Sequence, residues 1–168
     1  IPDKKLSSIF KKSDTIEQRR TSREEYRIGI PRVLNMYNLA PFFMAYFQSL
    51  GLKPANLVFS PFTNEKMYKE GAKRGSIDPC FPSKLAIPHV HYLLERHKKK
   101  AFNAIFFPMF DTLDTPLKSV AAPKSCPTVC STPESVKAAF TKESDIFTEN
   151  NLKFLDTFLN IDEPLLHS

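Results

Sequence analysis

Cysteines are the residues of this sequence best suited to chemistry. The chain has three of them, Cys80, Cys126 and Cys130, and the odd number argues against a disulfide framework. Thiol or metal chemistry is the better functional interpretation, although isolated cysteines also serve as small buried hydrophobic residues. Cys126 and Cys130 stand in the segment CPTVC, whose spacing differs from the Cys-x-x-Cys of redox dithiols and zinc knuckles. Spacing alone is therefore a weak indication of a site.

Several common catalytic motifs are missing. With only four glycines, the sequence contains neither Gly-x-Gly-x-x-Gly nor a phosphate-binding P-loop, so we expect no ATP hydrolysis by this chain. It also lacks a Gly-x-Ser-x-Gly elbow and a His-Glu-x-x-His zinc helix. His89 and His91 would point about 200° apart on a helix and would not chelate one ion. We interpret both as surface or core-edge histidines.

Composition and charge favour a cytoplasmic globular protein. At 168 residues, with 42% hydrophobic and 25% charged residues, the chain is long enough for one domain with a substantial core. No apolar run reaches the roughly 18–20 residues of a membrane span, and the polar start is not a secretory signal. The net charge of +6 sits largely in residues 1–27 and in the run Arg96–Lys100. Without an aromatic–basic signature, it favours a solvated surface over nucleic-acid binding.

The pattern of apolar residues predicts the strands and helices that position the cysteines and histidines. Short continuous apolar runs predict buried strands at Arg27–Pro31, Leu57–Ser60, Ala104–Phe107 and Thr128–Ser131. Helical spacing predicts helices over 39–50, 63–74, 83–97 and 132–140, and a final one through Leu152, Leu155, Phe158 and Leu159. We expect Pro88 to kink or restart the helix over 83–97.

The alternation of these elements predicts an α/β fold. Buried strands separated by helices indicate a doubly wound, mostly parallel sheet of Rossmann or flavodoxin-like type, with helices on both faces. We interpret residues 27–168 as a single domain excised from a larger protein. Residues 1–26 are expected to be a linker or tail, partly helical from Ser13 to Tyr26.

A parallel sheet would gather three sulfur-bearing residues. Ligands bind beyond the carboxyl ends of parallel strands. Met109 follows the third expected strand, Cys126 enters the fourth, and Cys80 precedes the helix over 83–97. We therefore expect Cys80 and Cys126 to converge on one edge with Met109, their sulfurs facing a shared cavity. Cys130 should instead point into the sheet and lie among apolar side chains.

Four separated segments resemble one family. They are RIGIPRVLNMYNLAPFF, DPCFPSKLAIPHVHYLLE, AIFFPMFDTL and SCPTVCSTPESVKAAF, in this order over 27–165. They resemble the poorly characterised, dehydratase-like domain of large activators of (R)-2-hydroxyglutaryl-CoA dehydratase, the CoA-substrate-specific enzyme activases. The resemblance implies an accessory domain in ATP-driven, low-potential electron transfer. It also implies two partners, an actin-like ATPase module and a dehydratase-like protein that carries cluster-ligating cysteines.

The same resemblance suggests roles for individual residues. Cys80 matches the cysteine of the family's Cys-aromatic-Pro-x-Lys motif, and Cys126 matches that of a later Cys-Pro-x-Val motif, which makes both candidate metal ligands. Lys84 and His89 match a lysine and a histidine of the first stretch. They are weaker candidates for cofactor binding, and we expect one of them at the rim of the cavity.

The sequence departs from the family pattern at two positions. Met109 stands where many relatives carry a cysteine, and Pro88 replaces a usual glycine. An iron–sulfur cluster is generally held by several thiolates, so this chain does not supply a full set alone. Three explanations of the incomplete ligand set remain open. The cluster has a ligand that is not cysteine, it has a ligand from another segment or subunit, or it has been lost. We expect a cluster in the full-length protein, none in this fragment, and no catalysis by the isolated chain.

Two other classes of function remain open. The first is an α/β interaction module that kept the fold and lost the cluster. The second is a domain that binds CoA esters. In the second case, basic residues such as Arg32, Lys84 and the Arg96–Lys100 run would meet phosphates. Neither interpretation predicts a nucleic-acid or membrane partner.

Overall fold

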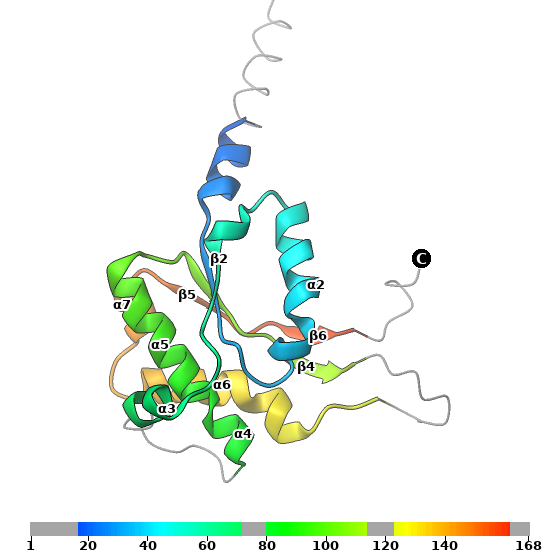
Figure 1. The fold of residues 1–168 in the computed structure, drawn as a ribbon, viewed down its shortest axis with the longest axis vertical. Coiled ribbons are helices and arrows are strands. Elements are labelled where there is room, and N and C mark those ends of the chain that lie inside the picture. The colour runs from blue at the N-terminus through cyan, green and yellow to red at the C-terminus, as the bar shows by residue number, and fades with distance from the viewer. Residues whose placement is uncertain (1–16, 72–79, 114–122, 162–168) are drawn as a thin grey trace, which may run out of the picture.

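A parallel four-stranded sheet forms the centre of the molecule (Figure 1). The computed structural model describes residues 17–71, 80–113 and 123–161. The strand order is β2 (Leu57–Phe59), β1 (Ile28–Ile30), β3 (Ala104–Phe106) and β5 (Lys153–Leu155). Each neighbouring pair is parallel. The predicted α/β fold with a parallel sheet is confirmed.

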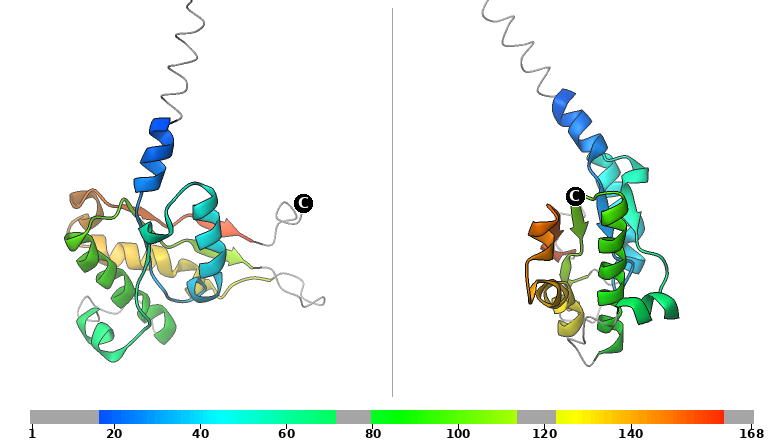
Figure 2. Two further views of the ribbon diagram at one scale, coloured as in Figure 1. Left: turned by 45° about the horizontal axis from the view of Figure 1, so that its top comes forward. Right: turned by 90° about the vertical axis from the view of Figure 1, so that its left-hand side faces the viewer.

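Helices surround this sheet (Figure 2). They are α2 (Met36–Ser49), α3 (Glu65–Gly71), α4 (Phe81–Lys84), α5 (Ala86–Lys99), α6 (Pro127–Thr141) and α7 (Ile146–Glu149), with a 3-10 turn η1 (Pro54–Asn56). Residues 17–25 form a further helix, which projects from the amino end of β1 (Figure 1). No helix in the described ranges is long and apolar enough to cross a membrane.

Side-chain contacts place α2 and α5 on opposite faces of the sheet. The ring of Phe106 in β3 lies 4.9 Å from that of Phe43 and 5.1 Å from that of Phe47, both in α2. A Cβ atom built on Gly29 in β1 would lie 3.3 Å from Leu93 of α5. Gly29 is in register with the residue before Phe106, and successive strand residues face opposite sides. The sheet is therefore covered on both faces.

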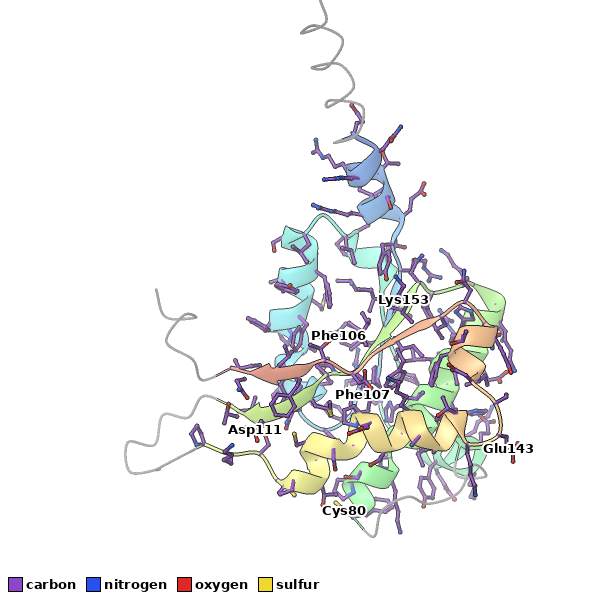
Figure 3. The ribbon with its side chains drawn as sticks, turned by 180° about the vertical axis from the view of Figure 1, so that it is seen from behind. Cys80, Phe106, Phe107, Asp111, Glu143 and Lys153 are labelled. Atoms are coloured by element: carbon purple, nitrogen blue, oxygen red, sulfur yellow. The ribbon has the colours of Figure 1, made fainter. Side chains whose placement is uncertain are left out.

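A second pair of strands prolongs the sheet. β4 (Met109–Thr112) and β6 (Phe158–Asn160) are parallel and follow directly after β3 and β5. The Phe107 N–H donates to the Leu155 carbonyl at 2.9 Å, and the Met109 N–H donates to the Thr157 carbonyl at 2.9 Å. Pro108 between them has no N–H, which interrupts the ladder. Figure 3 shows Lys153 in β5 and Asp111 in β4 towards the two ends of this ribbon.

The predicted strand Thr128–Ser131 is wrong, because these residues belong to α6. Pro127 occupies the first helical position, where its fixed φ favours a helix and its missing N–H costs nothing. The helix therefore begins five residues before the start signal expected at Thr132. Within it, the Thr132 hydroxyl donates to the Thr128 carbonyl at 2.6 Å. The β-branched residues of this segment favoured a strand only in isolation.

The predicted final helix is also wrong. Leu152 directly precedes β5 and Leu155 is its last residue. Phe158 and Leu159 lie in β6. Two strands separated by Asp156 and Thr157 place apolar residues at spacings that mimic a helical stripe. The short α7 precedes them, and the carboxylate of Asp145 accepts the N–H of Phe147 at 3.1 Å as its cap.

The remaining expectations agree with the structure within a few residues. The first three predicted strands are β1, β2 and β3, and the helix expected over 39–50 is α2. The helix expected over 83–97 is divided at Leu85 into α4 and α5, so Pro88 lies in the first turn of α5. Of the helix expected over 63–74, α3 covers the described part, and the rest lies outside the described residues. The helix expected from Ser13 is present over 17–25, and its first residues lie outside the described ranges.

Candidate functional site

A buried hydrogen-bond network lies at the carboxyl ends of β1 and β2. Ser60 directly follows β2, and its hydroxyl lies 2.6 Å from Nδ1 of His89 in α5. The same hydroxyl accepts the backbone N–H of Arg32, two residues beyond β1, at 2.7 Å. Ser60 is 1% exposed and His89 is 0% exposed. One buried serine thus ties the loops after two strands to α5.

The network continues from His89 towards the surface. Its Nε2 lies 3.0 Å from the hydroxyl of Thr63, which lies 3.5 Å from the hydroxyl of the exposed Tyr37. A neutral imidazole has one N–H and one acceptor nitrogen. One of the two hydroxyls that flank the ring therefore donates to it, and the other accepts from it. The side chains form a continuous path from the sheet edge to the surface.

His89 is neutral at physiological pH. Burial, and secondarily the positive charge of Arg32, lower the pKa of His89 from 6.5 to about 4. Of the interpretation of His89 as a surface or core-edge histidine, the surface position is wrong, because the side chain is fully buried and hydrogen-bonded to two hydroxyls. Both ring nitrogens are engaged by hydroxyl groups, which fixes the ring orientation.

Acidification should therefore destabilise the fold through His89. Because the folded-state pKa of about 4 lies below the unfolded value of 6.5, the unfolded chain binds a proton more readily. The stability contribution is fully present above the unfolded pKa and is lost as pH falls through the window between the two values. Between about pH 7.5 and about pH 5, the free energy of unfolding should fall by about 2 kcal/mol from this group. Urea unfolding at a series of pH values measures this loss. A His89→Gln chain should lack it, and an unchanged pH dependence in that chain would contradict the assignment.

The guanidinium of Arg32 lies beside this network. Its central carbon is 4.5 Å from the ring centroid of Phe62 and 5.3 Å from that of Phe59. Phe62 is also stacked on Tyr37, with ring centroids 6.2 Å apart. Cation–π attraction to two rings holds the charge in place.

The two thiols expected to form a site begin two neighbouring helices. Half-buried Cys80 is the residue before α4, and exposed Cys126 is the residue before α6. Three residues after Cys80, the hydroxyl of Ser83 hydrogen-bonds that of Thr132 in α6 at 2.9 Å. Figure 3 shows Cys80 beside α6, which packs against α4. That the two sulfurs face a shared cavity stays a prediction.

Lys84 and Met109 occupy less distinctive positions. Lys84 is the half-buried last residue of α4. Met109 is half-buried at the start of β4, where its backbone N–H is part of the ribbon ladder. The roles assigned to both by resemblance stay predictions.

The expectation that Cys130 lies in apolar packing is wrong. It is half-buried in α6, one turn after Cys126, and its N–H donates to the Cys126 carbonyl at 2.9 Å. Burial, and then the negative charge of Asp111, raise the pKa of the Cys130 thiol, while Lys124 acts in the opposite direction. Lys124 and Asp111 form an ion pair at 2.7 Å. A raised pKa disfavours the thiolate that binds metals.

The thiols of this chain do not fit a complete iron–sulfur cluster. Such clusters are usually held by about four cysteine thiolates, whereas the whole sequence contains three cysteines. The raised pKa of the Cys130 thiol disfavours its use as a thiolate ligand. Over the described ranges, no three His, Cys, Asp or Glu side chains gather as a metal-binding group.

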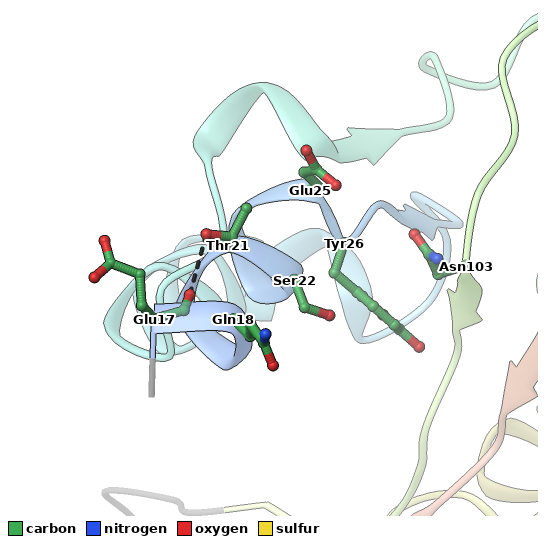
Figure 4. Close-up of a pocket in the computed structure, with 7 residues that line it drawn as sticks. All are labelled: Glu17, Gln18, Thr21, Ser22, Glu25, Tyr26 and Asn103. Atoms are coloured by element: carbon green, nitrogen blue, oxygen red, sulfur yellow. Dashed lines mark hydrogen bonds between the residues drawn. The ribbon is translucent and has the colours of Figure 1, made fainter. Parts of the chain in front are cut away.

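A hollow lies at the opposite, amino edge of the sheet (Figure 4). Its volume is about 770 Å³, and the helix over 17–25, Tyr26 and Asn103 line it. Asn103 directly precedes β3, whereas ligands of parallel sheets bind beyond the carboxyl ends of strands. The network around Ser60 and His89 is therefore the better candidate site.

Sequence reasoning missed Ser60 and Thr63 as parts of this site. Ser60 directly follows β2, and Thr63 lies three residues further along, at the end of the segment SPFT. Polar residues immediately after a strand of a parallel sheet are a recognisable signal, because this edge collects ligand-binding loops.

Comparison with known proteins gives one result. Residues 27–166 match the family described as the CoA enzyme activase uncharacterised domain. No curated protein and no solved structure matches the sequence.

Proposed function

Because the chain belongs to the family of CoA enzyme activase uncharacterised domains, we propose that it is an accessory, dehydratase-like domain of an ATP-driven activator of the 2-hydroxyacyl-CoA dehydratase type. In that setting it acts in iron–sulfur-dependent, low-potential electron transfer. Its partners are an ATPase module, in the same or another chain, and a dehydratase-like protein. The observation that supports this function is that Cys80 and Cys126 precede two helices, which the Ser83–Thr132 hydrogen bond holds together.

The contribution of this chain is a pair of thiols rather than a whole ligand set. An iron–sulfur cluster supplies one-electron chemistry when it is bound. Cys80 and Cys126 would hold part of it, and the other ligands would come from another segment or subunit. Cys126 lies at the positive end of the 15-residue α6, which favours negative charge there. No electron-transfer step is assigned to this chain alone.

Serine substitutions in the full-length activator test this function. Under anaerobic conditions, Cys80→Ser and Cys126→Ser should each lower the bound iron and sulfide. Each should also reduce ATP-dependent electron transfer to the dehydratase partner by at least about tenfold, because ligand loss changes the charge and potential of a cluster. Iron and sulfide quantification, visible absorbance and stopped-flow reduction of the partner provide the readouts.

Cys130→Ser is the matched control, since Cys130 lies one turn along the same helix and its raised pKa disfavours a thiolate. It should leave iron content and electron transfer unchanged. Unaltered cluster content and electron transfer in both Cys80→Ser and Cys126→Ser would mean that these thiols are structural. The domain would then be an interaction module that has the fold without the cluster.

A further inference from the structure

Arg32 is a positioned cation at the ligand-binding edge of the sheet. Its backbone N–H is held by Ser60, so the loops after β1 and β2 meet at this residue. Its guanidinium lies against the rings of Phe59 and Phe62. In parallel α/β sheets, the crevice beyond the carboxyl ends of the strands receives the ligand.

The charge of Arg32 is not neutralised by the described part of the chain. Among the described residues, no carboxylate forms an ion pair with it, and its buried Nε has no hydrogen-bond partner. Glu65, the acidic residue closest to Thr63 in sequence, pairs with Lys69 instead. Among these residues the guanidinium thus lacks an anionic acceptor, which favours the binding of an anionic ligand.

Arg27 provides an internal comparison. Its guanidinium also lies over a ring, 5.1 Å from the centroid of Phe102. However, its Nη1 donates to the carbonyls of Lys100 and Ala101 at 3.0 Å each. Arg27 precedes β1 and lies at the amino edge of the sheet. The Nε of Arg27 also has no partner, so the difference between the two arginines lies in Nη1, which binds backbone carbonyls in Arg27.

The surroundings of Arg32 combine hydroxyl groups with exposed aromatic surface. The Thr63 and Tyr37 hydroxyls continue the hydrogen-bond path from His89. Tyr37 is 41% exposed and Phe62 is 66% exposed, and their rings stack with an interplanar angle of 26°. Aromatic side chains of this kind stack on nucleic-acid bases, and an arginine fork recognises phosphate oxygens. His89 is neutral and adds no competing charge.

We propose that Arg32, Tyr37, Phe62 and Thr63 form a binding site for a phosphate-bearing nucleotide. The guanidinium of Arg32 binds the phosphate through paired N–H donors, and the Thr63 and Tyr37 hydroxyls offer further hydrogen bonds. The exposed rings of Tyr37 and Phe62 pack against the base. The adenosine 3′,5′-bisphosphate part of CoA and a free adenine nucleotide both have this chemistry. The proposal is independent of Cys80 and Cys126.

Titration calorimetry on the 168-residue chain tests the site. The probes are CoA, adenosine 3′,5′-bisphosphate, ATP and inorganic phosphate, each added separately. At least one adenine-containing probe should bind, and inorganic phosphate should bind at least about tenfold more weakly, because stacking adds to the affinity. Binding of CoA and the bisphosphate but not ATP identifies CoA as the source, whereas tighter binding of ATP identifies a free nucleotide. Equal binding of phosphate and nucleotides would overturn the assignment of a nucleotide.

Paired substitutions locate the binding. Arg32→Gln should weaken nucleotide binding at least about tenfold, and Arg32→Lys should lie between it and the original chain, because lysine keeps the charge and loses the fork. Phe62→Ala should weaken nucleotide binding more than phosphate binding, because it removes the stacking ring and only one of the two rings that hold the Arg32 guanidinium. Arg27→Gln is the matched control and should bind normally. Unfolding midpoints of all four chains separate a binding defect from a folding defect. Absence of binding by every probe, or equal loss in Arg27→Gln and Arg32→Gln, would refute the site.

Discussion

Replacing His89 by alanine is expected to lower the free energy of unfolding by about 4 kcal/mol. The ring is fully buried and hydrogen-bonded through both nitrogens, to Ser60 and to Thr63. Its removal leaves a cavity in the packing of α5 and deprives the buried Ser60 hydroxyl of a partner. Each of these defects costs about 2 kcal/mol in protein interiors. Urea unfolding of the purified chain, followed by circular dichroism, measures the change.

His89→Gln and His97→Ala are the controls for this prediction. Glutamine keeps a polar group near the position of Nε2, so the loss should be clearly smaller than with alanine. His97 is half-buried on the same helix, with its Nδ1 accepting the Phe102 N–H at 3.0 Å. Its replacement should cost less than that of His89, because its other hydrogen bond, to the Asn150 carbonyl, is exposed to solvent. A loss at His89 no larger than at His97 would contradict the role of the buried network.

Gly71→Ala is expected to destabilise the fold by about 3 kcal/mol. Gly71 ends α3 and is buried against Pro88 in the first turn of α5. A Cβ atom at this position would lie 2.3 Å from the Cα of Pro88 and 2.8 Å from its Cβ. Because these atoms belong to a proline in a helix, they cannot rotate away as a flexible side chain would. The substitution must push α3 and α5 apart and disturb the adjacent His89.

Gly29→Ala is the matched control for Gly71→Ala. Its Cβ would lie 3.3 Å from the end of the Leu93 side chain, so that a side-chain end and not a backbone atom must shift by a few tenths of an ångström. The expected loss is below about 1 kcal/mol. The urea unfolding midpoints of the Gly71→Ala and Gly29→Ala chains measure the two losses of stability. Equal losses would show that a close approach of backbone atoms at Gly71 does not govern the packing of these helices.

Local patterns predicted the elements whose signals come from their own residues. The strands at Ile28–Ile30, Leu57–Phe59 and Ala104–Phe106 are continuous apolar runs, and the periodic stripe of α2 faces Phe106 through Phe43 and Phe47. The parallel arrangement followed because each of these strands is separated from the next by a helix. Such signals are sufficient to predict a strand when it is buried on both faces, because consecutive residues are then apolar.

Local patterns gave wrong predictions where the same apolar or β-branched pattern is compatible with both a helix and a strand. The residues of TVCS have strand propensity, but Pro127 before them begins a helix that packs on β4 and α5. Leu155 and Phe158 are three residues apart, as on a helical face, yet they lie in two strands paired with β3 and β4. Pairing with distant strands supplied the hydrogen bonds that decided these conformations, and tertiary context commonly overrides propensity.

The family, the α/β architecture and the shortage of thiols for a complete cluster can all be read from the sequence. Only the tertiary structure showed that Ser60 joins Arg32 to His89, because these residues come from three segments separated by 28 or more positions. It also distinguished Arg32 from Arg27, since the difference lies in which backbone carbonyls come within reach. Burial and hydrogen-bond partners are properties of the packed chain. The neutral state of His89 at physiological pH and the placement of the Arg32 guanidinium against two aromatic rings therefore arise only on folding.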